Sequence, residues 1–111
     1  MTAIKWLEPW VPVEHFEMDD KNGYCAAWER QLQREVGPQH LLRGMSVQLI
    51  ARRFDCDEAL FSLANGQIAE VHLTWARGEE ADPRWPGTAL FPSIEAWAHE
   101  SMGPLHEEWG S

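Results

Sequence analysis

Four side chains that can move protons or accept hydrogen bonds lie on one face of a predicted hairpin, toward its open end: Asp57, Glu70, His72 and Thr74. The hairpin is predicted from two apolar runs separated by Asn-Gly at 65–66, a pair typical of a two-residue type I′ turn. Counted outward from that turn, His72 lies diagonal to Asp57 and on the same face as Glu70 and Thr74. A carboxylate beside an imidazole fixes the imidazole tautomer and favours its charged form, as general-base catalysis uses. The spacing therefore makes these four residues candidate catalytic residues.

The same four residues also fit a solvated sheet face that carries an incidental histidine. Glu70 and His72 are two residues apart on one strand, so they line up without having to converge on a substrate. No complete nucleophile–base motif accompanies them. An enzyme of hydrolase-like or metal-assisted type and a surface without chemistry both remain open at this point.

The other face of the predicted hairpin carries the core. In the same register, Leu60 faces Val71, Glu58 faces Leu73 and Cys56 faces Trp75. We expect Cys56 to be a packing residue, because Asp55 and Asp57 on either side oppose thiolate formation. The chain has no Cys-x-x-Cys pair, so thioredoxin-like redox chemistry has no support.

A metal site requires three or four convergent ligands. His99 with His106, or Asp55 and Asp57 with His72, are conceivable sets, but neither has a recognised ligand spacing. The sequence also lacks a Gly-rich phosphate loop and a Gly-x-Ser-x-Gly elbow. We therefore predict no metal and no cofactor.

The elements that must position these residues are predicted from periodicity and turn residues. The pattern indicates a single α+β domain over residues 1–111, with a small antiparallel sheet of three to four strands covered on one face by two helices. The strands are expected at about 45–54, 58–64, 67–75 and, as a possible fourth, 88–91. The helices are expected at about 20–36 and 93–102, with Gly103-Pro104 ending the second. Residues 1–18 read as an extended arm rich in Pro and Trp, and residues 103–111 as a loose tail.

Charge narrows the range of partners. The chain of 111 residues has 18 acidic and 9 basic residues, a net charge of -9. Nucleic-acid binding needs a basic surface that the sequence does not supply, and no apolar run is long enough to span a membrane. The N-terminus lacks the features of a secretory signal. We expect a cytoplasmic protein, monomeric or homodimeric, with a basic protein as its possible partner.

Six of the seven Trp residues fall into two groups. Trp28, Trp75 and Trp97 lie on periodic elements, which favours core packing. Trp10, Trp85 and Trp109 lie in predicted irregular segments. Of these, Trp10 and Trp85, together with Arg84, are the candidate binding residues, since indoles contribute heavily to protein interfaces. Core packing is the alternative for the indoles in irregular segments as well.

The core "RRFDCDEALFSLANGQIAEVHLTW", followed by "DPRWP" and "SIEAW", resembles a group of small uncharacterised bacterial proteins. They share an Asp-Cys-Asp turn and a Val-His-Leu-Thr-Trp strand, and the resemblance covers roughly residues 40 to 100. It implies a bacterial cytoplasmic origin and an α+β fold, but no activity or catalytic residue. Taken with the charge and the missing catalytic motifs, it leads us to expect a non-enzymatic protein-binding or inhibitor-type domain. The alternative is a small enzyme centred on His72 and Asp57.

Overall fold

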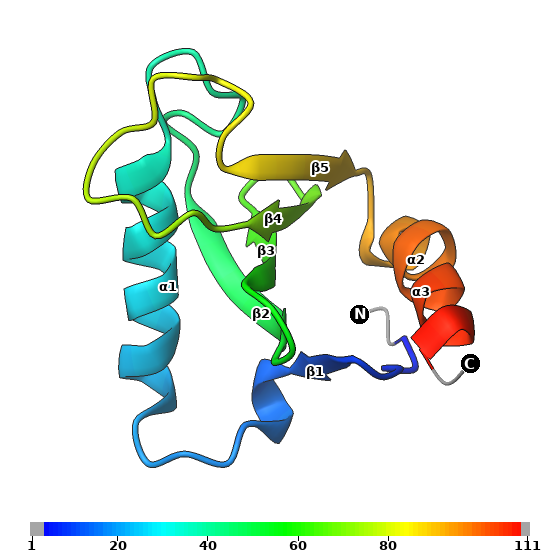
Figure 1. The fold of residues 1–111 in the computed structure, drawn as a ribbon. Helices are drawn as coiled ribbons and strands as arrows, with labels where there is room; N and C mark the ends of the chain where they lie inside the picture. The colour runs from blue at the N-terminus through cyan, green and yellow to red at the C-terminus, as the bar shows by residue number, and fades with distance from the viewer. Residues whose placement is uncertain (1–3, 110–111) are drawn as a thin grey trace.

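An antiparallel sheet lies between helices on both of its faces in the computed structural model, which describes residues 4–109 (Figure 1). The five strands follow one another in chain order across the sheet. Helix α1 covers one face, and a C-terminal helical segment, residues 94–109, lies on the other side. The strands are β1 (Trp10–Pro12), β2 (Val47–Arg53), β3 (Glu58–Leu63), β4 (Ile68–His72) and β5 (Gly87–Phe91).

The predicted α+β fold with an antiparallel sheet is confirmed, but the predicted number of strands is too low. The additional strand, β1, comes from the N-terminal arm and pairs with the end of β2. Proline is tolerated there because β1 is an edge strand, where a backbone N–H is not needed on the outer side. A short 3-10 turn, η1 (Val13–His15), follows it.

Helix α1 (Lys21–Glu35) forms where periodicity predicts it. The side chain of Asp20 caps it by accepting a 2.9 Å hydrogen bond from the Gly23 amide. Its buried residues Trp28 and Leu32 pack on one face of the sheet in a cluster that includes Phe61 and Val71. This cluster is the larger of the two cores.

A second core lies on the opposite face, where the prediction placed no helix. Trp97 of α2 (Ile94–Trp97) is fully buried and meets Trp10 edge-on, with ring centroids 5.2 Å apart. Leu60 and Met102 complete the centre of this cluster. Buried aromatic area on both faces explains why the sheet needs two helical layers.

The C-terminal segment does not stop at Gly103-Pro104. It passes from α2 through one π-helical turn, η2 (Ala98–Met102), into α3 (Gly103–Trp109). The Gly103 amide donates to the carbonyl of Ala98, one residue further back than in an α-helix. Because proline has no N–H and crowds the carbonyl four residues earlier, the wider turn lets the helix continue through Pro104. The predicted loose tail at 103–111 is therefore wrong up to Trp109, and residues 110 and 111 lie outside the described range.

The predicted hairpin forms, but its register is wrong by one residue. The Leu63 amide donates to Gln67 and the Gly66 amide donates to Leu63, so Ala64, Asn65 and Gly66 form a three-residue loop. Only Gly66 of the three has a positive φ, +91°, which fits a type I turn followed by a left-handed glycine. Glu58 therefore faces His72, and Leu60 faces Glu70.

Candidate functional site

The actual register gathers Glu58, Glu70 and His72 on the face of the sheet opposite α1. Glu58 on β3 lies opposite His72 on β4, with 3.7 Å between Glu58 Oε1 and His72 Nδ1. Glu70, two residues before His72, projects from the same face because side chains alternate. A one-residue slip moves every side chain to the other face, which is why the predicted partner Asp57 is replaced by Glu58.

The carboxyl group of Glu58 lies in surroundings that oppose its ionisation. Partial burial raises the pKa of Glu58, and the neighbouring Glu70 raises it further. Arg53 and His72 act in the opposite direction, and Nη1 of Arg53 lies 4.0 Å from the Glu58 carboxylate. A carboxylic acid whose proton is held more tightly than usual is a candidate proton donor or a receptor for a cation.

Glu70 also holds the C-terminal segment against the sheet. Its Oε1 accepts a 2.8 Å hydrogen bond from Nε1 of Trp97 and a 2.6 Å hydrogen bond from the hydroxyl of Ser101. These two donors fix the position of the Glu70 carboxylate. The candidate residue Glu70 therefore has a structural role in addition to its place in the cluster.

A hollow of about 310 Å³ opens beside these side chains, and we call it the acidic trough. Its lining comes from β3, β4 and β5: Glu58, Glu70, His72, Gly87, Thr88 and Ala89. Gly87 pairs with His72 and Ala89 with Glu70, so the side of the trough at the sheet edge carries only a hydrogen and a methyl group. The trough is therefore open toward the edge of the sheet.

Asp57 and Thr74 do not join the trough. Asp57 is exposed, and its carbonyl accepts a 3.2 Å hydrogen bond from the Leu73 amide. Thr74 turns away to the end of α1, where its amide and hydroxyl both donate to Glu35 Oε1, at 2.8 and 2.9 Å. The predicted four-residue cluster is thus divided between two places in the fold.

Glu35 is the residue that binds Thr74 and so keeps it away from the acidic trough. It is fully buried, and its Oε2 accepts from Gln31 Nε2 at 2.7 Å and from the Trp75 amide at 2.8 Å. With the two contacts from Thr74, both oxygens serve as acceptors only, as a carboxylate requires. Glu35 is seven residues after Trp28 and three after Leu32, so it lies on the buried stripe of α1.

The Glu35 contacts end β4 and hold Trp75 outside the core. Trp75 was expected to pack in the core, but it is 47% exposed and has φ +59°, a conformation that is rare for a bulky residue. One edge of its ring still meets Trp28, with centroids 4.9 Å apart. The Glu80 amide also donates to the Glu35 carbonyl, at 2.9 Å, so the following loop is attached to the same helix end.

Buried His40 anchors the other part of this loop. Its Nδ1 accepts from the Leu42 amide at 3.0 Å, so Nε2 carries the proton and donates to the Pro86 carbonyl at 2.9 Å. Pro86 is buried, while the preceding Trp85 is 46% exposed and Arg84 is exposed beside Asp82. The Trp85 ring flanks Gly87, since a Cβ on that glycine would lie 3.6 Å from Cζ3. Trp85 therefore stands at the end of the acidic trough.

The other predicted binding residue, Trp10, is only 2% exposed and belongs to the second core. It is not available to a partner, because its indole fills the space between β1 and Trp97. The core explanation is the correct one for Trp10 and the wrong one for Trp75. This difference depends on the hydrogen bonds that the Thr74 and Trp75 amides donate to Glu35, which hold Trp75 outside the core.

Arg52 is a further residue whose role the sequence did not show. Its guanidinium lies 3.8 Å from the ring centroid of Trp28 and 4.8 Å from that of Phe54. It donates to the Tyr24 hydroxyl and, at 2.9 Å, to the Cys56 carbonyl. Arg52 is buried, so it supports the β2–β3 turn and does not offer a surface charge.

Cys56 lies in that turn and is partly buried, outside both core clusters. Burial raises the pKa of its thiol, which opposes nucleophilic use. Nearby Arg53 binds both oxygens of Asp55, at 3.0 and 2.6 Å, and holds the pKa of Asp55 below its ordinary value. Arg52 and Arg53 thus both hold the Asp-Cys-Asp turn through hydrogen bonds.

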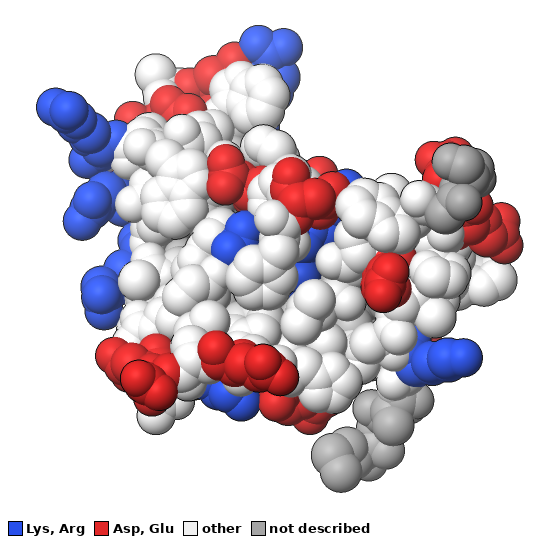
Figure 2. Space-filling view, turned by 60° about the horizontal axis from the view of Figure 1, so that its bottom comes forward, with Lys and Arg blue, Asp and Glu red and all other residues white. Residues whose placement is uncertain are grey.

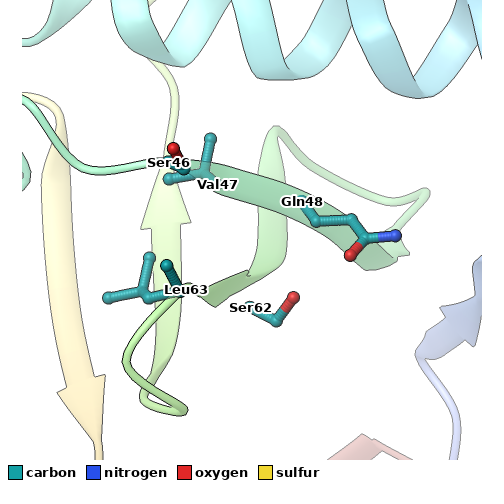
Figure 3. Close-up of a pocket in the computed structure, with 6 residues that line it drawn as sticks. Ser46, Val47, Gln48, Ser62 and Leu63 are labelled. Atoms are coloured by element: carbon teal, nitrogen blue, oxygen red, sulfur yellow. The ribbon is translucent and has the colours of Figure 1, made fainter.

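Another hollow, about 330 Å³, lies at the other end of the hairpin, between the start of β2 and the end of β3 (Figure 3). Its lining is uncharged: Ser46, Val47, Gln48, Ser62, Leu63 and Ala64. In Figure 3 the side chains of Gln48 and Leu63 point away from each other. Because no acid, base or nucleophilic thiol lines this hollow, it offers no catalytic chemistry.

Charge is unevenly distributed on the surface. On the face shown in Figure 2, acidic side chains form several separate groups, and basic side chains stand along the left edge and also at the top, near the centre and on the right. Within residues 4–109, no group of three His, Cys, Asp or Glu side chains is arranged to hold a metal ion. None of the helices in this range is long and apolar enough to cross a membrane.

Comparisons of the chain with protein-family models, with curated proteins and with solved structures gave no match. The function must therefore be argued from the geometry of the acidic trough and of the loops beside it.

Proposed function

We propose that the chain is a protein-binding domain and that its partner presents a basic surface. The observation that carries the proposal is a pair of half-exposed indoles, Trp75 and Trp85, held on one loop, residues 73–86, by buried side chains. Glu35 fixes the beginning of this loop and His40 fixes its end. Aromatic residues held in place before binding lose little conformational freedom when a partner covers them.

The loop 73–86 is joined to the loop 37–46 and to the end of α1. Arg43 of the loop 37–46 donates to the carbonyl of Val36 and forms an ion pair with Glu79. Leu41, 53% exposed, also lies in the loop 37–46. These loops form one end of the molecule in Figure 1, and we call this end, residues 37–46 and 73–86, the loop end. Its exposed apolar side chains, rimmed by polar residues, have the composition of a binding surface.

Net charge supports a basic partner. With nine more acidic than basic residues, the chain attracts a basic surface at long range and repels a second acidic protein. Attraction of this kind weakens as salt screens it. Binding should accordingly be stronger at low than at high ionic strength.

Affinity capture with a matched tryptophan variant tests the proposal. The tagged chain, Trp85→Ala and Trp109→Ala are each incubated with bacterial lysate, and the bound proteins are quantified by mass spectrometry. Trp109 is 44% exposed on α3, so its variant loses a similar indole elsewhere on the surface. We expect a basic protein retained by the wild type and by Trp109→Ala and lost with Trp85→Ala. Equal recovery by all three at low salt, or no recovery, contradicts the proposal.

The raised pKa of Glu58 supports a second candidate, a small enzyme that transfers protons in the acidic trough. Glu58 would donate the proton to the substrate. His72, whose Nδ1 lies 3.7 Å from Glu58 Oε1, would orient the Glu58 carboxyl group or return a proton to it. A panel of chromogenic esters and glycosides tests this candidate. Hydrolysis that Glu58→Gln abolishes while Glu100→Gln leaves it unchanged would favour the enzyme over the binding domain.

A further inference from the structure

The outer edge of β5 is available for another strand. β5 is the last strand of the sheet, and no described residue pairs with it on the side away from β4. Natural edge strands are usually protected by charged side chains, proline or bulges. The sequence of β5, "GTALF", has neither a charge nor a proline, and its pairing with β4 is regular throughout. Its backbone can therefore accept an added strand.

The acidic trough lies directly inside this edge. Ala89 and Gly87 separate the edge from Glu70 and His72, and both have minimal side chains. Neighbouring strands are about 4.8 Å apart, so a strand added beyond β5 would lie about 10 Å from β4. A lysine or arginine on that strand and Glu70 on β4 together span this distance across the methyl group of Ala89. A larger residue at position 89 would block the contact.

The charges of the trough select the occupant. The charge of Glu70 opposes that of Glu58, and Arg53, whose Nη1 is 4.0 Å from the Glu58 carboxylate, already binds Asp55. A cation brought over Ala89 would relieve this repulsion. A second copy of the chain would instead bring another uncharged β5 and another acidic trough onto the same sheet face. Charge complementarity thus favours a basic segment over a second copy.

We infer that β5 takes up an extended segment of a basic protein as a sixth strand, with alternate Lys or Arg side chains placed in the acidic trough. Backbone hydrogen bonds supply the pairing, and the alternate basic side chains supply the selectivity, as in other strand-addition complexes. Trp85 at the end of the trough offers an indole face on which a further cation can stack. The inference rests on the proposed function, because it names the partner's chemistry and its place of binding.

The test uses the full chain and a capped peptide of alternating valine and lysine, seven residues long. Amide shifts are followed by NMR during titration, with an alternating valine–glutamate peptide and a peptide with consecutive lysines as controls. We expect the valine–lysine peptide to shift the amides of β5 and the carboxyl carbons of Glu58 and Glu70. Both control peptides should bind about tenfold more weakly or not at all.

Two substitutions on β5 locate the contact. Ala89→Lys places a permanent cation in the trough and should weaken the peptide about tenfold or more, whereas Leu90→Lys adds the same charge on the opposite sheet face and should change affinity by less than about threefold. Leu90 is 39% exposed, so the chain can accommodate the lysine, and thermal unfolding verifies that both variants fold. Peptide binding that leaves β5 unshifted, equal effects of the two substitutions, or no binding overturns the inference.

Self-association is the remaining outcome. If the β5 amides shift with protein concentration and sedimentation shows a dimer, a second copy occupies the edge and the inference is wrong. The proposed function can survive that result. A basic protein captured through Trp85 whose recovery is unchanged by Ala89→Lys would keep the binding domain and place its contact at the loop end.

Discussion

The backbone amide of Trp75 donates a 2.8 Å hydrogen bond to the buried carboxylate of Glu35. This contact joins the end of α1 to a half-exposed indole and forces the chain out of β4 after His72. A residue with positive φ and no glycine freedom persists only where its surroundings hold it. The stability of the helix end and the presentation of the loop end therefore depend on the same carboxylate.

Replacing Glu35 with Gln should destabilise the fold and release the loop end. The amide NH₂ would face donors from Gln31, Thr74 and Trp75, and one or more of them would lose its acceptor. A buried donor that loses its hydrogen bond to a carboxylate lowers the free energy of unfolding, here by about 2 to 4 kcal/mol. We expect a loss of this size in the free energy of unfolding from urea denaturation.

The neighbouring exposed residue provides the control for Glu35. Arg34→Gln changes one charge on the solvent side of the same helix turn and should shift stability by less than about 0.5 kcal/mol. Tryptophan fluorescence should show greater exposure of the Trp75 indole in Glu35→Gln alone. Equal stabilities of the two variants would contradict the role assigned to Glu35.

In contrast to Glu35→Gln, Glu58→Gln should raise the free energy of unfolding at neutral pH. Burial and Glu70 raise the pKa of Glu58 in the folded chain, so the folded state binds this proton more tightly than the unfolded state does. The stabilising contribution of Glu58 is full below its ordinary pKa of 4.5 and is lost as pH rises through the higher folded pKa. The uncharged amide avoids that loss, and we expect a gain of about 1 kcal/mol or less near pH 7 for this half-buried group.

The pH dependence distinguishes this effect from a general change in packing. Urea denaturation of wild type and Glu58→Gln should diverge near neutral pH and converge below pH 4.5. The exposed Glu100→Gln serves as the control and should follow the wild type throughout. A variant that is less stable than wild type at pH 7 would show that the contacts of Glu58 with Arg53 and His72 outweigh its repulsion from Glu70.

Periodicity was enough to predict most of the elements, because it reports which side of an element is buried. The β3 and β4 segments, α1 and the start of α2 lie close to their predicted positions. Strand β1 was missed because its three residues, one of them a proline, do not form a recognisable strand pattern. The continuation of the last helix was missed because the π-helical turn that accommodates Pro104 depends on packing, and Gly-Pro ordinarily ends a helix.

The site was harder to predict because it depended on one residue of register. Asn-Gly fits both a two-residue type I′ turn and the last positions of a three-residue loop. The chain uses the second, and the choice replaces Asp57 by Glu58 as the partner of His72. The role of Glu35 follows from a contact over 40 positions to Trp75, which no local pattern contains.

Gly66→Ala tests the three-residue loop directly. Gly66 has φ +91° and open space around its Cα, so alanine would meet strain from its own backbone and no clash with neighbours. We expect a loss of about 1 kcal/mol in the free energy of unfolding. Gly78→Ala is the matched control, since it also has open space but no positive φ, and it should be neutral or slightly stabilising. Equal effects at the two positions would argue against the left-handed conformation at Gly66.

Arg52→Lys should destabilise the chain although it preserves the charge. Lysine cannot donate at once to the Tyr24 hydroxyl and the Cys56 carbonyl while placing its charge over the Trp28 ring, as the guanidinium does. The loss of a buried hydrogen bond and of the stacking should cost about 2 kcal/mol in thermal or urea unfolding. The adjacent Arg53→Lys retains a partly exposed ion pair with Asp55 and should cost less than about 1 kcal/mol. A larger loss for Arg53→Lys than for Arg52→Lys would show that the ion pair with Asp55, and not the aromatic stack, holds the turn before β3.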